Sequence, residues 1–262
     1  MMRSAEVDYC GLRVAVLVAA CRRSGQGGAE RFYDGLIGGF KELGCEAEMI
    51  PLPADEPSFD VIIDNYRHCE SMDLSRYDLV VSTKAPTYAV KHRAHVLYLV
   101  HTVRVFDDMF EAAFPQASVE QFVQRSSLHA LDLAAMLGAK ARFAIGHEVA
   151  SRLFRWRGLT AEVMHPPLGV HNLRNAPSEG YLFMPGRLHP WKRVDLAIEA
   201  VRQSQLPLKL VIAGTGEAEG SLRRLAADDP RVDFLGHISD EELVEWYAKA
   251  LAVVFTPLHE DY

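Results

Sequence analysis

The chain has 262 residues, of which 49% are hydrophobic and 24% are charged. This length suits one large domain or two of moderate size, and the composition is sufficient for sizeable buried cores. The formal net charge of −7 excludes a positive field over the whole chain, and with it a general affinity for nucleic acid. The four cysteines form no CxxC pair, so we expect reduced thiols in a cytoplasmic protein rather than a disulfide or metal framework.

The first apolar run, residues 12–20, predicts a buried strand. It is shorter than the roughly 20 residues that span a bilayer, and it lacks the flanking pattern of a signal peptide. A glycine-rich turn at 24–30 follows, and the helical spacing over 31–43 ends at Gly44. The start of the chain is therefore typical of a strand–turn–helix unit.

The same alternation continues to the middle of the chain. Further segments are apolar runs at 59–64, 79–82 and 96–100, helical patterns at 119–137 and 148–156, and strand patterns at 47–52, 141–145 and 160–164. Residues 166–180 are rich in Pro, Gly, Asn and Ser and show little periodicity, which predicts an interdomain linker.

After the linker the alternation restarts. Strands are expected at 181–184, 208–213, 232–235 and 252–255, and helices at 191–202, 219–227 and 241–251. Strands that alternate with helices predict parallel sheets covered on both faces. We therefore expect an α/β protein with two Rossmann-like domains, residues 1–168 and 178–262, and a cleft between them. The last predicted strand has no covering helix after it, so we expect an incomplete second domain, either truncated or completed by a partner.

Arg187 and Lys192 are the leading candidates for a binding site. They lie in a turn between a predicted strand and a predicted helix, where helix N-termini and nearby cations favour phosphate groups. The alternative is an ordinary solvated helix start.

Glycines mark two other predicted strand ends. Gly25, Gly27 and Gly28 follow the first strand, where backbone N–H groups can approach a phosphate or a sugar closely. The spacing departs from GxGxxG, which disfavours NAD, and a tight turn without a ligand is the alternative. Gly214 and Gly216 follow the strand at 208–213, a weaker signal by itself.

Three further polar residues follow predicted strands. His101 and His237 stand at strand exits, and Glu260 follows the last strand. A strand exit is where ligands bind in such folds, but a lone histidine is as often structural, and Glu260 is equally read as a frayed terminal acid. Ser239 and Glu242 have the spacing of a helix capping box.

Together these segments resemble the GT-B glycosyltransferases of family 4, the group 1 glycosyltransferases. The matching segments are 27–31, 186–192, 213–216, 234–243 and 259–262. Residues 99–104 and 165–167 resemble the mannosyltransferase-like branch, although Val103 replaces its proline.

The resemblance implies a role for each candidate residue. Arg187 and Lys192 would hold the donor diphosphate, and Gly27 and Gly28 would approach the diphosphate and the sugar. The remaining assignments are Gly214, Gly216 and His237 in the nucleotide pocket, His101 beside the donor sugar, Glu260 on the sugar, and Asp261 and Tyr262 with their backbone on phosphate. His101 and Glu260 are thus the implied catalytic residues, and the second acid of the family's Glu-x7-Glu motif would fall beyond Tyr262.

The implied activity is retaining transfer of a hexose from a nucleotide-diphosphate sugar to a glycan or lipid-linked glycan, without a metal, in polysaccharide biosynthesis. GDP-mannose is the first expectation for the donor, and UDP-sugars come next. The alternatives are a non-catalytic nucleotide-sugar-binding remnant, one part of a two-subunit enzyme, and an NAD-dependent oxidoreductase. The basic and aromatic segment 152–157 could also contact an anionic bilayer, against the simpler interpretation of a solvated helix face.

Overall fold

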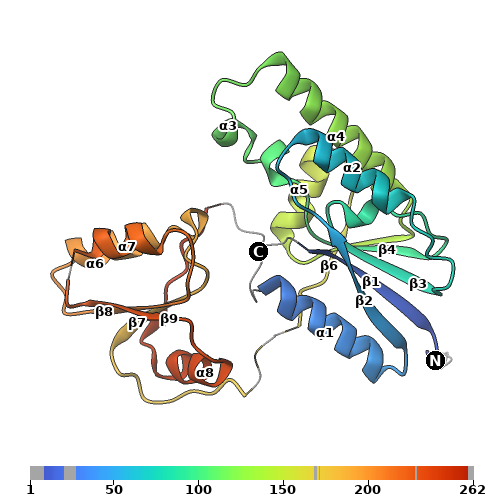
Figure 1. Ribbon diagram of the computed structural model, residues 1–262. Helices are drawn as coiled ribbons and strands as arrows, with labels where there is room; N and C mark the ends of the chain where they lie inside the picture. Colours follow the sequence, from blue (N-terminus) through green and yellow to red (C-terminus); the bar gives the residue numbers. More distant parts are fainter. Residues whose placement is uncertain (1–8, 21–27, 168–169, 171, 228, 259–262) are drawn as a thin grey trace. The chain divides into compact units, whose positions relative to one another are not determined.

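The computed structural model describes residues 9–20, 28–167, 170, 172–227 and 229–258. The chain divides near residue 170 into two compact units, and each is described by itself. Both are α/β units whose described strands pair only in parallel, which confirms the predicted fold class (Figure 1).

The first unit is built on a six-stranded sheet with the order β2-β1-β3-β4-β5-β6. Its strands are β1 Arg13–Ala20, β2 Glu46–Pro53, β3 Leu79–Lys84, β4 His95–His101, β5 Ala141–Ala144 and β6 Glu162–Val163. Its helices are α1 Gly28–Glu42, α2 Phe59–Glu70, α3 Phe110–Ala113, α4 Val119–Leu137 and α5 His147–Arg157, with 3-10 turns η1 Thr87–Ala89 and η2 Arg104–Phe106.

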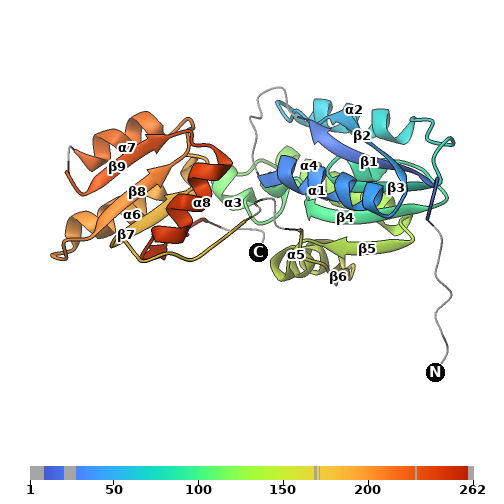
Figure 2. The ribbon, with the colours of Figure 1, turned by 90° about the horizontal axis from the view of Figure 1, so that it is seen from below.

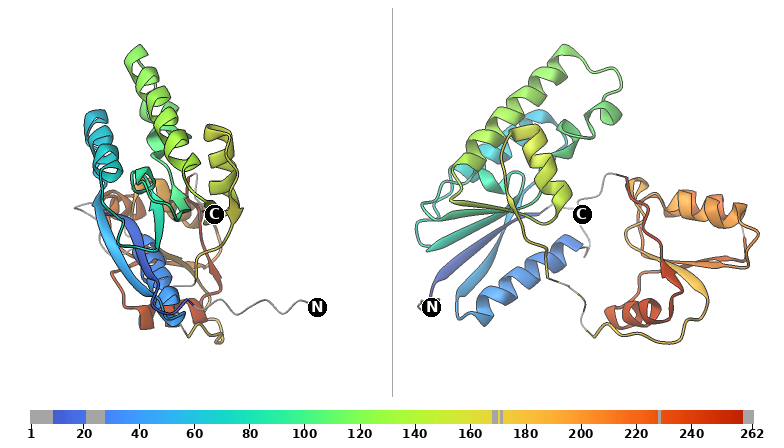
Figure 3. Two further views of the ribbon diagram at one scale, coloured as in Figure 1. Left: turned by 90° about the vertical axis from the view of Figure 1, so that its right-hand side faces the viewer. Right: turned by 180° about the vertical axis from the view of Figure 1, so that it is seen from behind.

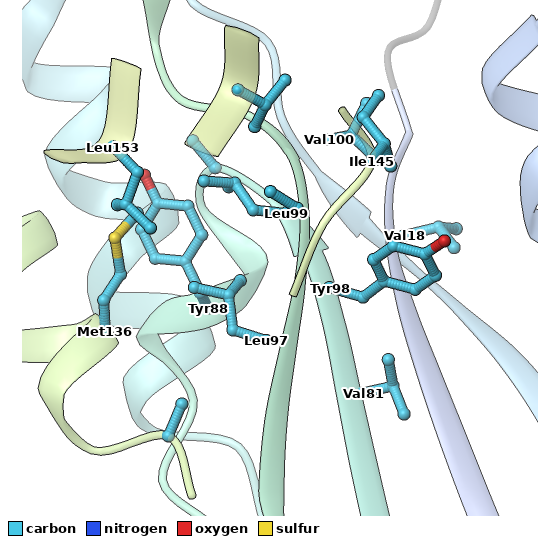
Figure 4. Close-up of a cluster of buried hydrophobic side chains, with 14 of the residues drawn as sticks. Val18, Val81, Tyr88, Leu97, Tyr98, Leu99, Val100, Met136, Ile145 and Leu153 are labelled. Atoms are coloured by element: carbon cyan, nitrogen blue, oxygen red, sulfur yellow. The ribbon is translucent and has the colours of Figure 1, made fainter. Parts of the chain in front are cut away.

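Helices cover this sheet from both sides. Helix α1 lies on one face, and α2, α4 and α5 lie on the other (Figure 3). Because side chains alternate along a strand, β4 contributes to both layers. Figure 4 shows Leu97 and Leu99 on the side of Tyr88, Met136 and Leu153, and Tyr98 on the side of Val18 and Val81.

The second unit has a four-stranded sheet with the order β10-β7-β8-β9. Its elements are β7 Tyr181–Pro185, η3 Pro190–Lys192, α6 Val194–Gln203, β8 Lys209–Ala213, α7 Glu219–Ala226, β9 Val232–Gly236, α8 Asp240–Lys249 and β10 Ala252–Val253. Helices α6 and α7 cover one face, and α8, which faces the viewer in Figure 2, covers the other. The chain therefore reverses its direction across the sheet between β9 and β10.

Local sequence signals fix several boundaries. Helix α4 has its expected bounds, with a capping box formed by Ser118 and Gln121. Ser239 and Glu242 also form the expected capping box at the start of α8. In both helices the serine hydroxyl satisfies a backbone N–H that has no partner within the helix.

The apolar run at 59–64, for which the sequence analysis gave no element type, is the start of α2, because Ser58 caps a helix whose buried residues Ile62, Tyr66 and Cys69 follow helical spacing. One predicted boundary differs from the structure. The helix expected from Trp191 begins only at Val194. Pro190 starts a separate 3-10 turn, and Arg193 has a φ of 51°, which cannot continue a right-handed helix.

The two helices α6 and α7 offer a matched test of this packing. Leu222 is 6% exposed inside the core of the second unit, whereas Leu196 on α6 is 44% exposed. Leu222→Ala should lower the free energy of unfolding by about 2–4 kcal/mol, because it removes apolar contacts and leaves a cavity. Leu196→Ala should cost less than about 1 kcal/mol. Urea denaturation followed by tryptophan fluorescence measures both, and equal costs would contradict the packing described.

Candidate functional site

Three strands of the second unit end at one edge of the sheet, and each ends at a glycine. Gly186, Gly214 and Gly236 follow or close β7, β8 and β9, with φ values of 149°, 127° and 72°. These angles are rare for residues with a Cβ atom. The carboxyl edge of a parallel sheet is also where ligands bind in open α/β folds.

The turns at this edge pack backbone against backbone. The Gly186 N–H donates to the Ala213 carbonyl at 2.9 Å, and the Gly214 N–H donates to the Gly236 carbonyl at 2.7 Å. A Cβ atom on Gly214 would lie 2.0 Å from the Gly186 carbonyl oxygen, and one on Gly216 would lie 2.4 Å from the Leu188 carbonyl oxygen. Both positions therefore require glycine for packing, whatever ligand the turns bind.

Arg187 follows the first of these glycines and remains largely exposed. Its guanidinium Nη2 lies 3.3 Å from Oε2 of Glu217, while Nε2 of His189 lies 3.1 Å from Oε1 of the same carboxylate. A hydrogen bond from its own backbone N–H lowers the pKa of Glu217, and the charges of His189 and Arg187 lower it further. The sequence analysis missed Glu217, although it directly follows the Gly-x-Gly turn.

Lys192 lies where the strand order of the second unit reverses. The segment after β10 packs against its turn: the Leu258 N–H donates to the Trp191 carbonyl at 2.7 Å, and the Thr256 hydroxyl donates to the Arg193 carbonyl at 3.0 Å. The Lys192 ammonium is 5.9 Å from the centre of the Phe255 ring. Such a reversal is the usual ligand position in open α/β sheets.

Of the remaining candidate residues in the second unit, the structure describes only His237. Exposed His237 follows Gly236, at the same edge as Arg187. Glu260, Asp261 and Tyr262 lie outside the described residues. Among the residues that are described, no group of three or more His, Cys, Asp or Glu side chains could hold a metal ion.

In the first unit, His101 closes β4 as expected. Its Nδ1 is 2.8 Å from the carbonyl oxygen of Thr102, which can only accept, so Nδ1 carries the proton. Gly28 begins α1, and Gly27 is outside the described residues. Val103, which replaces the proline of the mannosyltransferase-like branch, is buried in the core.

Behind His101 lies a buried charged network that the sequence analysis did not anticipate. Asp107, Asp132 and Arg157 are all buried, and Arg157 pairs with both carboxylates. Burial raises the pKa of Asp132. The charge of Arg157 and the hydrogen bonds from the Tyr66 and Tyr88 hydroxyls offset part of this rise. A signal existed: Arg157 continues the buried helical positions Val149 and Leu153 at intervals of four.

This network overturns the interpretation of 152–157 as a basic surface. Arg152 and Arg157 are 2% and 6% exposed, because both side chains pair with buried or nearly buried aspartates. Of the three arginines in the segment, only Arg155 is exposed. Separately, no helix within the described part of the chain is both long and apolar enough to cross a membrane.

Comparison with known protein families gives a match over the second unit. Residues 172–262, which include the whole Arg187 turn, match the sequence profile of the family "Glycosyl transferases group 1". No protein of curated function matches the chain.

Solved structures share the fold over nearly the whole chain. Sucrose-phosphate synthase from Thermosynechococcus elongatus is 14% identical with a TM-score of 0.67, over 96% of this chain and 77% of that one. Anabaena HepE, solved in complex with UDP-glucose, is 15% identical with a TM-score of 0.60, over 94% and 74%. WaaG, a glycosyltransferase involved in lipopolysaccharide biosynthesis, is 13% identical with a TM-score of 0.60, over 93% and 75%.

The chain resembles a glycosyltransferase. The second unit carries the group 1 similarity, and the whole chain has the GT-B fold expected from its sequence. At these identities the solved structures establish the fold alone.

The tight turns predict a sharp contrast between two glycines of the second unit. Gly214→Ala should cost more than about 1 kcal/mol, because its φ is unfavourable for alanine and the new methyl group meets the Gly186 backbone. Gly220→Ala should be neutral or stabilising, since Gly220 lies in α7 and the nearest atom to a new Cβ is 3.7 Å away. Thermal denaturation distinguishes them; similar melting temperatures would argue against the backbone packing of the turns.

Proposed function

We propose that this protein is a retaining glycosyltransferase that moves a hexose from a nucleotide-diphosphate sugar to a glycan or lipid-linked glycan acceptor. The observation that carries the proposal is the exposed Arg187 on a glycine turn at the carboxyl edge of the second sheet, within the segment that matches the group 1 profile.

The proposed role of Arg187 and Lys192 is to bind the donor diphosphate. During transfer, negative charge develops on the leaving nucleoside diphosphate, and fixed cations that face this charge lower the barrier. Arg187 is well suited because its side chain is 63% exposed and its Glu217 partner is itself 47% exposed. An exposed ion pair of this kind is weak, so a diphosphate can replace the carboxylate.

The nucleotide itself is assigned to the turns beside Arg187. Gly214 and Gly216 pack directly against the backbone of Gly186 and Leu188, which holds the turn after β8 beside Arg187. His237, at the neighbouring strand end, completes this proposed pocket. Asp261 and Tyr262 would add backbone contacts to phosphate.

The sugar is assigned to His101 and Glu260, with Gly27 and Gly28 close to the diphosphate and the sugar. The Nδ1–H of His101 donates to the Thr102 carbonyl, which fixes the orientation of the imidazole ring beside the proposed sugar position. No metal is part of the proposed mechanism, because the two cations supply the charge that a metal would otherwise provide.

Two donors deserve direct comparison. Residues 99–104 favour GDP-mannose through their resemblance to the mannosyltransferase-like branch, whereas the similar HepE structure contains UDP-glucose.

The buried thiols of Cys45 and Cys69 support a cytoplasmic location.

Calorimetric titration of the purified chain with GDP-mannose, UDP-glucose and NAD tests the proposal. We expect saturable binding of one nucleotide sugar, weakened about tenfold or more by Arg187→Ala, since a hydrogen bond to a charged group contributes about 1.5–3 kcal/mol. The matched control is Arg224→Ala, an exposed arginine of α7, which should bind like the wild type.

Binding of NAD alone would favour the oxidoreductase alternative. Binding of a nucleotide sugar that Arg187→Ala leaves intact would place the diphosphate elsewhere. Either result would overturn the assignment of the donor site to Arg187 and Lys192.

A further inference from the structure

The loop that leaves β4 is fixed to two helices by buried charges. It begins at Thr102, directly after His101, and passes through η2 to Asp107 and Asp108. Two clusters of side chains hold these aspartates, and each cluster includes an arginine from α5.

The first cluster surrounds Asp107. Its Oδ1 lies 2.8 Å from Nη1 of Arg157 and 2.9 Å from Nε2 of His129 on α4. Its Oδ2 accepts a short hydrogen bond from the hydroxyl of Thr102. The carboxylate therefore joins the residue after His101 to both helices.

The second cluster surrounds Asp108, which lies 3.0 Å from Nε of Arg152 and 3.3 Å from Nη2 of Arg104. Arg104 belongs to the loop itself, so this cluster closes the loop on α5. The backbone adds a further constraint, because the Phe106 N–H donates to the Val103 carbonyl at 3.0 Å.

This arrangement specifies geometry more than it adds stability. Buried ion pairs gain little over well-packed apolar side chains, because desolvation offsets much of the attraction. Their directional bonds, however, allow only one arrangement of the groups that they join. A buried network that reaches a strand end therefore fixes what lies at that strand end.

We propose that Asp107 is a positioning residue for His101, acting through the Thr102 hydroxyl and the Thr102 carbonyl that accepts from His101 Nδ1. This inference rests on the proposed function in one respect, which is the proposed contact of His101 with the donor sugar.

Asp107 is suited to this role because it remains a carboxylate. Burial raises its pKa, but the hydrogen bond from His129 and the charge of Arg157 more than offset burial, so the pKa falls below its ordinary value. An ionised carboxylate only accepts hydrogen bonds, which fixes the direction of the Thr102 hydroxyl.

The sharpest variants are at Thr102. Thr102→Val removes the hydroxyl with little change of shape, and Thr102→Ser retains it. With the best donor found by calorimetry, Thr102→Val should lower kcat by about 10-fold to 100-fold with little change in donor KM, because misplaced reacting groups lose rate rather than ground-state binding. Thr102→Ser, which keeps the hydroxyl, should have a kcat close to that of the wild type.

Asp107→Asn should behave like Thr102→Val. Its matched control is Asp132→Asn, an equally buried aspartate that also pairs with Arg157 but bonds to Tyr66 and Tyr88 instead of Thr102. The control should lose stability, but measured below its melting temperature it should retain kcat. In a His101→Ala background, Thr102→Val should have no further effect on kcat.

A second measurement does not depend on transferase activity. In protein labelled with ¹⁵N-histidine, the His101 ring nitrogens, assigned with His101→Ala, should shift in Thr102→Val and Asp107→Asn but not in Asp132→Asn. An unchanged His101 spectrum, or an equal loss of kcat with and without His101, would overturn the positioning role. If no nucleotide sugar binds to the wild type while the His101 shifts appear, the proposed function fails and the positioning role stands.

Discussion

The second unit depends on the direct contact between the backbones of its strand-end turns. A Cβ atom on Gly214 would lie 2.0 Å from the Gly186 carbonyl oxygen, so this contact exists only with glycine at that position. The contact fixes the path of the chain on either side of Arg187. The same edge contains His237, and the segment after β10 brings Phe255 beside Lys192. Steric exclusion of side chains at Gly214 and Gly216 thus fixes the turn from which Arg187 projects.

In the first unit, buried charged side chains fix the loop beside the candidate residue. Its candidate residue His101 ends strand β4, and the loop beyond it is held by Asp107, Asp108 and two buried arginines. The two sets of ion pairs differ in solvation. Arg187 and Glu217 are exposed and can exchange partners with an incoming anion. Arg157 and Asp107 are buried, and separation of either from its partner would leave an isolated charge in the core. The exposed pair suits binding, and the buried pair suits positioning.

Local patterns predicted most elements of the fold but few of the contacts between them. The bounds of α4 and the capping box of α8 were predicted correctly, because both are encoded by the local spacing of residue types. The start of α6 was wrong, since the backbone conformation of Arg193 is not apparent from its residue type. The prediction of 152–157 as a basic surface was wrong, because the aspartate partners of Arg152 and Arg157 are distant in the chain: Arg157 pairs with residues 25 and 50 positions before it, and Arg152 pairs with Asp108.

The sequence by itself determined the alternation of strands and helices, the glycines at three strand ends of the second unit and the resemblance to group 1 glycosyltransferases, since these are encoded by periodicity, residue type and spacing. Only the tertiary structure decided that Glu217 faces Arg187 and His189, and that Asp107 joins Thr102 to Arg157. Those pairings depend on which loops the parallel sheets bring to one edge and on which charges are shielded from water. Neither is determined by any short stretch of residues.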